Sequence, residues 1–319
     1  MKKTIALLAI AGAIPQAQAS CGSMACEMNP AWDIESLTHD QGLRIDLRYN
    51  YSRADILRAG SDKVAPPDPT GSGEEIENKR TLNQSLTADL DYAINRAWSV
   101  SVQVPVVSRD HAHTIDSLPP EVEQASYTEL GDVRVAGKYR FMAGDHRWGG
   151  GVRFGLKLPT GDTGQEMVPG EPMEAGLQPG TGSTDLILGG HLHGAIADSK
   201  WGGFAQVQVQ TPLAHRSGFE PGHSYGVDLG VYYPFGESVT GLLQLNYLYR
   251  ARDSGALADP DGHSGGSATY FTPGLSVLVG ANMHAYGSVQ IPIRQKVNGE
   301  RTWISSRARL FSVPPTNTT

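Results

Sequence analysis

Charged side chains recur at every second position in several stretches that are otherwise apolar. In residues 43–51 the odd positions are apolar or aromatic and the even positions are charged or polar. An extended strand would place all of these charges on one face. The same spacing gives a candidate set for a charged lumen: Arg44, Arg48, Asp89, Asp91, Arg134, Lys138, Arg153 and Lys157. Around a pore, such cations and carboxylates set up a transverse field that selects permeants by charge. In a narrow lumen they would instead pair and fill the space.

Four sulfur-bearing residues lie close together near the start of the chain: Cys21, Met24, Cys26 and Met28. Thiolate and thioether groups are ligands that Cu(I) prefers, so this segment is a candidate soft-metal site. Cys21 and Cys26 are the only cysteines in the chain, and an oxidising compartment would favour a small disulfide loop between them. Their spacing fits neither haem attachment nor a zinc ribbon.

Two histidine pairs have a spacing of two residues. His191 and His193 would lie on the same lumen-facing side of a strand, where two imidazoles could ligate a metal, but the sequence identifies no third ligand. His111 and His113 fall in a stretch expected to be an outer loop. Both pairs are interpreted first as polar lumen or loop residues, and no cofactor is expected.

One pair of residues has the spacing of a hydrolase. His215 and Ser217 are similar to the His-x-Ser arrangement of an outer-membrane phospholipase, in which the hydroxyl passes its proton to the imidazole. The nearest substitute for the orienting residue is Asp228, and Gly218 and Pro221 make the segment loop-like. The sequence has no H-E-x-x-H motif. We therefore expect no catalysis, with a lipid hydrolase as the least favoured alternative.

The first residues indicate secretion. Lys2 and Lys3 precede an apolar stretch of about ten residues, and Ala17-Gln18-Ala19 gives an A-x-A cleavage site. A spanning helix needs about twenty apolar residues, so this stretch is too short for one. We expect a signal peptide at 1–19, a periplasmic extension or plug containing the cysteine pair at 20–41, a barrel at 42–313 and a tail at 314–319.

Alternation with a period of two extends over nearly the whole mature chain. The pattern predicts an all-β fold, a transmembrane up-and-down antiparallel β-barrel whose strands of about nine to twelve residues show one face to lipid and the other to water. Twelve such runs are found, at roughly 43–51, 82–92, 98–104, 133–141, 148–158, 185–193, 205–210, 225–233, 239–250, 271–279, 285–293 and 302–313.

The connections between these runs alternate long and short, as in outer-membrane barrels with long outer loops and short periplasmic turns. Long segments are expected at 52–80, 108–130, 159–184, 212–223 and 251–268, and the last outer connection, at 297–299, is tight. An even strand count returns both termini to the periplasm. Aromatic residues predict two interfacial girdles. One flanks the short turns (Tyr92, Trp98, Phe141, Trp148, Trp201, Tyr233, Phe235) and one the long loops (Tyr49, Tyr51, Tyr247, Tyr249, Tyr270).

Charge limits the partners. The formal net charge is −7, and loss of Lys2 and Lys3 with the signal peptide makes it −9, so nothing suggests nucleic-acid binding. The expected partners are outer-membrane lipid and lipopolysaccharide, because acidic outer loops could bind the divalent ions that bridge lipopolysaccharide. A periplasmic protein partner at the N-terminal segment is a further expectation.

Three segments resemble a known family. They are Leu130-Gly131-Asp132-Val133-Arg134-Val135-Ala136-Gly137-Lys138-Tyr139-Arg140-Phe141, then Leu156-Lys157-Leu158-Pro159-Thr160-Gly161-Asp162, and Gln178-Pro179-Gly180-Thr181-Gly182-Ser183-Thr184-Asp185. Together they resemble the family named for the meta-pathway of phenol degradation, whose members are described as outer-membrane transporters. The likeness covers most of residues 42–311. It departs at the end, where Phe311 is followed by eight more residues instead of closing the last strand.

The resemblance implies passage of small, apolar or aromatic compounds and no enzymatic activity. From the residues themselves we expect a passive outer-membrane channel or transporter for small solutes. The alternative is a scaffold or binding barrel in which the sulfur-rich segment holds a metal or a periplasmic partner.

Overall fold

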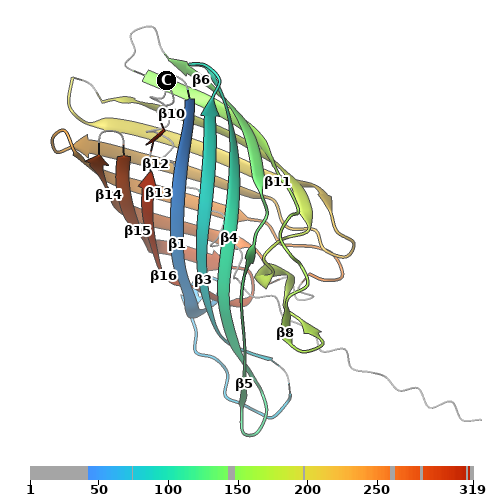
Figure 1. The fold of residues 1–319 in the computed structure, drawn as a ribbon. Coiled ribbons are helices and arrows are strands. Elements are labelled where there is room, and N and C mark those ends of the chain that lie inside the picture. The colour runs from blue at the N-terminus through green and yellow to red at the C-terminus, as the bar shows by residue number, and fades with distance from the viewer. Residues whose placement is uncertain are drawn as a thin grey trace, which may run out of the picture.

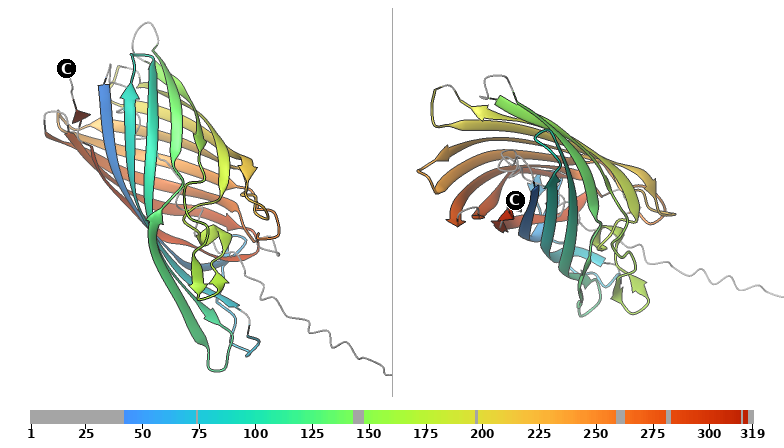
Figure 2. Two further views of the ribbon diagram at one scale, coloured as in Figure 1. Left: turned by 45° about the vertical axis from the view of Figure 1, so that its right-hand side comes forward. Right: turned by 45° about the horizontal axis from the view of Figure 1, so that its top comes forward.

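The alternation of apolar and polar residues becomes the two faces of one closed sheet. A computed structural model describes residues 42–73, 75–142, 148–196, 198–258, 263–280, 283–313 and 315–316. Twelve antiparallel strands form the ring in chain order, and the last strand pairs with the first (Figures 1 and 2). They are β1 (Gly42–Ala59), β3 (Glu75–Ala93), β4 (Trp98–Ile115), β6 (Arg134–Met142), β7 (Trp148–Lys157), β10 (Ser183–Ala195), β11 (Gly202–His215), β12 (Ser224–Pro234), β13 (Val239–Arg250), β14 (Gly266–Gly280), β15 (Met283–Val297) and β16 (Glu300–Val313).

The predicted fold class and strand number are therefore confirmed. The signal peptide, the extension at 20–41 and the sulfur cluster lie outside the described residues, so those expectations stay predictions. Two residues of the expected tail form β17 (Pro315–Thr316), which pairs with Leu43 and Arg44 of β1. None of the helices in the described residues is long and apolar enough to cross a membrane.

The outward face of the barrel is apolar. Leu229, Leu245, Phe271 and Ile291 are exposed neighbours in one row across β12, β13, β14 and β15. The residues that alternate with them are polar and buried, among them Asn246, whose side-chain nitrogen donates to Asp228 at 2.7 Å. This arrangement is the reverse of a soluble protein and matches a barrel surrounded by lipid.

Aromatic side chains gather at both ends of the strands. Trp98 and Tyr139 have ring centroids 4.9 Å apart at the end where β1 begins, called here the terminal end. Tyr225 and Tyr249 stack at 4.8 Å towards the opposite, far end. The girdle prediction is wrong for Tyr270, which is only 1% exposed, because Phe271 takes the outward position of β14 and parity turns Tyr270 inward.

Several strands are longer than the nine to twelve residues expected. β1 and β4 each have 18 residues and β3 has 19, so much of the segment expected as a loop at 52–80 is strand. The segment expected as a loop at 108–130 is a hairpin made of the end of β4 and β5 (Glu121–Leu130), which pairs with β4 (Figure 1). Apart from Val122 and Leu130, its outward residues, such as Asp110 and Ala112, are not large and apolar. The sequence therefore shows no continuous lipid-facing side there.

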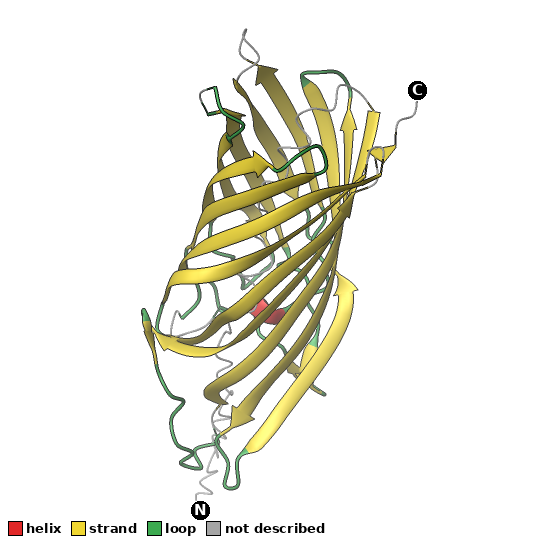
Figure 3. Cartoon of the chain, turned by 90° about the vertical axis from the view of Figure 1, so that its left-hand side faces the viewer, coloured by secondary structure: helices red, strands yellow, loops and turns green. Residues whose placement is uncertain are grey.

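The connection between β7 and β10 folds onto the inward face of the β4–β5 hairpin. It contains β8 (Glu166–Val168), β9 (Glu171–Pro172) and the 3-10 helix η2 (Ala175–Leu177), drawn red in Figure 3. Met167, Met173 and Leu177 form a buried cluster against Ala125 and Tyr127. The Tyr127 hydroxyl donates to the Leu177 carbonyl at 2.5 Å. This packing brings the connection to the far end of the barrel.

Asp116, at the tip of the β4–β5 hairpin, holds the neighbouring connection between β1 and β3. Its carboxylate accepts hydrogen bonds from Thr70 (backbone N, 2.6 Å; Oγ1, 2.5 Å), from Gly71 (backbone N, 2.8 Å) and from Ser72 (backbone N, 3.1 Å; Oγ, 2.7 Å). These donors, the Thr70 and Ser72 hydroxyls first, hold the pKa of the Asp116 carboxyl well below its usual range. Because the folded pKa is depressed, the stabilisation is present above the unfolded pKa of about 3.9 and is lost as pH falls through the folded value.

Asp116→Asn should therefore loosen residues 64–73 at neutral pH. An amide offers one acceptor oxygen where the carboxylate offers two, so part of the hydrogen-bond set is lost. Tryptic cleavage after the exposed Lys63 should become several-fold faster. Asp68→Asn, an exposed aspartate in the same connection, is the matched control. Equal cleavage rates for Asp116→Asn and Asp68→Asn would contradict this anchoring role.

Candidate lumen site

Charged residues of β1, β3 and β6 pair across the inward face. Arg48 lies 3.6 Å from Asp89, and Lys138 lies 2.6 Å from Asp91. Arg44 lies 3.7 Å from Asp46, whose carboxylate also accepts a hydrogen bond from Tyr286 at 2.8 Å. All of these atoms belong to side chains that are largely buried within the barrel. On this side of the lumen, neighbouring carboxylates therefore neutralise the charges of the predicted cations.

Lys157 is the most enclosed cation of the predicted set. Its side chain is 1% exposed, and Nζ lies 2.8 Å from Asp185 and 3.3 Å from Asp132. It also donates to Thr181 and, at 3.1 Å, to Ser183. A single buried ammonium between two carboxylates leaves a net negative cluster that polar neighbours must solvate.

The three segments that carry the family resemblance meet in this cluster. Asp132 comes from the first segment, Lys157 from the second, and Thr181 from the third. Asp132 accepts hydrogen bonds from the Gly161 backbone at 3.0 Å and from the Thr181 backbone at 3.0 Å. Gly180 packs against Gly161 so closely that an added Cβ would lie 2.3 Å from the Gly161 carbonyl oxygen. These motifs therefore anchor the connection between β7 and β10 to the barrel wall.

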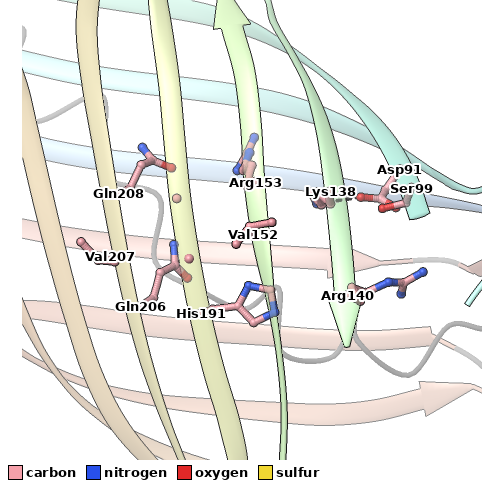
Figure 4. Close-up of a pocket in the computed structure, with 12 residues that line it drawn as sticks. Asp91, Ser99, Lys138, Arg140, Val152, Arg153, His191, Gln206, Val207 and Gln208 are labelled. Atoms are coloured by element: carbon pink, nitrogen blue, oxygen red, sulfur yellow. Dashed lines mark hydrogen bonds and ion pairs between the residues drawn. The ribbon is translucent and has the colours of Figure 1, made fainter. Parts of the chain in front are cut away.

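A second group of cations surrounds a pocket between β6, β7, β10 and β11 (Figure 4). Lys138 and Arg153 are direct cross-strand neighbours, and Arg140 lies on the same face of β6. Of the described residues that line the pocket, Asp91 is the only one with a carboxylate, and it pairs with Lys138. Among the described residues, the Arg153 guanidinium has no hydrogen-bond or ion-pair partner. Because like charges directly opposite each other repel, an anion held between Lys138 and Arg153 would relieve this arrangement.

His191 and His193 point into the lumen on β10, as their spacing predicts. Their ring centroids are 6.1 Å apart, with an angle of 28° between the ring planes. Each imidazole covers a glycine of β7: a Cβ on Gly151 would lie 2.7 Å from His191, and one on Gly149 would lie 2.7 Å from His193. In the described part of the chain no third metal ligand lies within reach of the pair. His191 instead forms one side of the cationic pocket.

Arg134 is the remaining member of the predicted lumen set. It is half-buried on β6, opposite Gln103 of β4 and Lys157 of β7. Sequence reasoning missed Gln206 and Gln208 as pocket residues. Their alternation put them on the inward face, but their position near Arg153 depends on the register of β10 with both neighbours, which sequence spacing does not give.

The hydrolase arrangement is not assembled. His215 ends β11, and its Nδ1 lies 3.1 Å from the Arg216 carbonyl, while Nε2 lies 3.8 Å from a Glu220 carboxylate oxygen. The Ser217 hydroxyl forms no hydrogen bond with this imidazole among the described residues. Asp228, the suggested orienting residue, accepts from Asn246 inside the barrel.

Comparison with known proteins supports the fold. No family model matches the chain, and no curated protein sequence matches it. A crystal structure of an outer membrane channel from Pseudomonas putida F1 is similar, with 14% sequence identity and a TM-score of 0.67, over 90% of this chain and 99% of that one. The toluene transporter TbuX of Ralstonia pickettii gives 10% identity and a TM-score of 0.46, over 95% and 99% of the chains. The β-domain of the Bordetella autotransporter BrkA gives 11% and 0.44, over 85% and 98%.

Proposed function

We propose that this protein is an outer-membrane channel for small solutes, with the far end outside the cell and both termini in the periplasm. The observation that supports the proposal most is Arg153, a cation on the inward face of the barrel that has no hydrogen-bond or ion-pair partner among the described residues. Burying a charge without a partner is costly, so the position is explained if water and a permeant anion reach it. The name of the similar Pseudomonas structure, an outer membrane channel, is consistent with this proposal.

The orientation follows from the connections. The turns at the terminal end are short, for example Ile94 to Ala97, whereas the connection from Leu158 to Gly182 at the far end is long. Outer-membrane barrels keep short turns in the periplasm and long loops outside. The acidic residues of these far-end connections would then face the lipopolysaccharide layer.

The permeants that suit the pocket are small organic anions. Three cations and one carboxylate line it, together with the amides of Gln206 and Gln208. An aromatic carboxylate could pair with Arg153 while its ring lies against the His191 imidazole. An aromatic carboxylate would suit the cations of the lumen, and it would also belong to the aromatic compounds that the family resemblance implies.

Planar-bilayer recording tests the proposal. The wild type should give small conductance steps with a preference for anions, and benzoate should block them. Arg153→Glu reverses the charge in the pocket and should shift the reversal potential towards cation selectivity and abolish the block. Arg252→Glu makes the same charge change in an exposed loop. At about 0.15 M salt, the field of an exposed charge is screened beyond roughly 8 Å. The ion selectivity of this variant should therefore stay that of the wild type.

A wild type that shows no conductance steps would count against the channel proposal. A chain lacking residues 20–41 should then be recorded, because that segment is expected to be a plug. Conductance in the shortened chain alone would support a plugged channel. Silence in both would overturn the proposal and favour a scaffold barrel filled by its paired charges.

A further inference from the structure

We propose that Glu75, His111 and His113 bind a divalent metal ion of the zinc class at the far end of the barrel. The three residues come from β3 and β4, and their ligand atoms all lie within 4.8 Å of one another. His113 Nδ1 is 3.4 Å from His111 Nε2 and 3.3 Å from Glu75 Oε1. His111 is fully buried and His113 is 8% exposed, so the two imidazoles hold one geometry.

The two distances from His113 Nδ1 to the other ligand atoms fit tetrahedral zinc. Zn–N and Zn–O bonds of about 2.0–2.1 Å place neighbouring ligand atoms about 3.3–3.4 Å apart along a tetrahedron edge. Both distances around His113 Nδ1 have this value. Imidazole nitrogens with a single carboxylate favour zinc-like ions over magnesium or calcium, which prefer all-oxygen ligands. Three protein ligands leave the fourth position for water.

The outer nitrogens of both imidazoles are held by oxygen atoms. His111 Nδ1 lies 2.8 Å from the Thr81 hydroxyl, and His113 Nε2 lies 3.2 Å from a Glu123 carboxylate oxygen. A metal-bound histidine usually donates its remote N–H to such a partner, which fixes the tautomer. With both protons directed outward, the lone pairs of His111 Nε2 and His113 Nδ1 face each other beside the Glu75 carboxylate. A cation between them would turn this repulsion into attraction.

The strands place the ligands through their register. His111 and His113 are two residues apart on β4 and share its inward face. Thr81 lies directly opposite His111 on β3, and Glu123 lies directly opposite His113 on β5. A register shift in β3 between Ile76 and Arg80 brings Glu75 to the side of His113. The spacing of the two histidines is visible in the sequence. The third ligand, Glu75, could not be predicted, because its position depends on this register shift.

Equilibrium dialysis of the refolded full chain with zinc chloride tests the site. After chelator treatment, the wild type should bind one more equivalent of zinc than Glu75→Gln or His113→Gln. The double variant His191→Gln/His193→Gln should bind as the wild type does, since it removes a histidine pair that lacks a third ligand. Heat-modifiable migration on a gel should show that every variant is folded. Cobalt in place of zinc should give the intense visible bands of a tetrahedral site.

Glu123→Gln keeps all three ligands and serves as the second variant. Loss of the carboxylate that orients His113 should weaken zinc affinity about 10–100-fold without changing the stoichiometry. Equal zinc stoichiometry and affinity in the wild type, Glu75→Gln and His113→Gln would overturn the proposal. So would loss of the equivalent in the His191/His193 variant alone.

Discussion

Lys157→Met should destabilise the folded barrel by about 3–5 kcal/mol, because it leaves Asp132 and Asp185 as uncompensated buried charges. Methionine fills a similar volume, so the loss reports the charge and not a cavity. Urea unfolding of the barrel in lipid vesicles, followed by tryptophan fluorescence, measures the change as a shift of the midpoint.

A second substitution separates charge from packing. Lys157→Met combined with Asp185→Asn removes one of the two repelling carboxylates and should recover part of the lost stability. Lys63→Met, at an exposed lysine, should change the stability by no more than a few tenths of a kcal/mol. A Lys157→Met midpoint as close to the wild type as that of Lys63→Met would show that the cluster contributes nothing.

Val207→Arg should lower the free energy of unfolding by about 2–4 kcal/mol, because it places a charge on the lipid face near the bilayer midplane. Val207 is 47% exposed and lies six positions beyond Trp201 of the terminal-end girdle. A strand tilted by about 40° advances roughly 2.5 Å per residue across the membrane, which puts Val207 about 15 Å inside.

Gln208→Glu is the control, one residue along β11 and on the opposite face. Its carboxylate would enter the polar lumen at the pocket that Arg153 lines, so the barrel should keep close to wild-type stability. Unfolding midpoints of the two variants in the same vesicles give the comparison. Equal losses of stability at the two positions would contradict the assignment of one face of β11 to the lipid and the other to the lumen.

The sequence predicted the barrel because the period of two is strongest where one face meets lipid. In residues 98–104 valines alternate with serines and glutamine, and that pattern alone fixes which side chains turn inward. The pattern fails where the strands leave the membrane. Between Ser108 and Thr114 neither face is apolar, so the β4–β5 hairpin was expected as a loop.

The candidate site was less predictable, because it depends on which strands are neighbours and in what register. Parity places Lys138 and Arg153 in the lumen, but only the pairing of β6 with β7 puts them side by side. Pairing likewise brings Lys138 to Asp91, while the described part of the chain gives Arg153 no ion-pair partner. The contacts of Asp132 come from two other segments, 156–162 and 178–185, and no spacing within one segment encodes them.

The pairing of β16 with β1 has a consequence for biogenesis. It joins Leu47 to Ser312 and continues to Ala59 and Glu300, so the seam connects the two ends of the chain. Until residues 300–313 are in place, both seam edges would present bare backbone donors and acceptors to hydrocarbon, which costs several kcal/mol for each unsatisfied group. A partly inserted sheet therefore gains little, and insertion must be close to all-or-none. The barrel can close only when β16 has paired with β1.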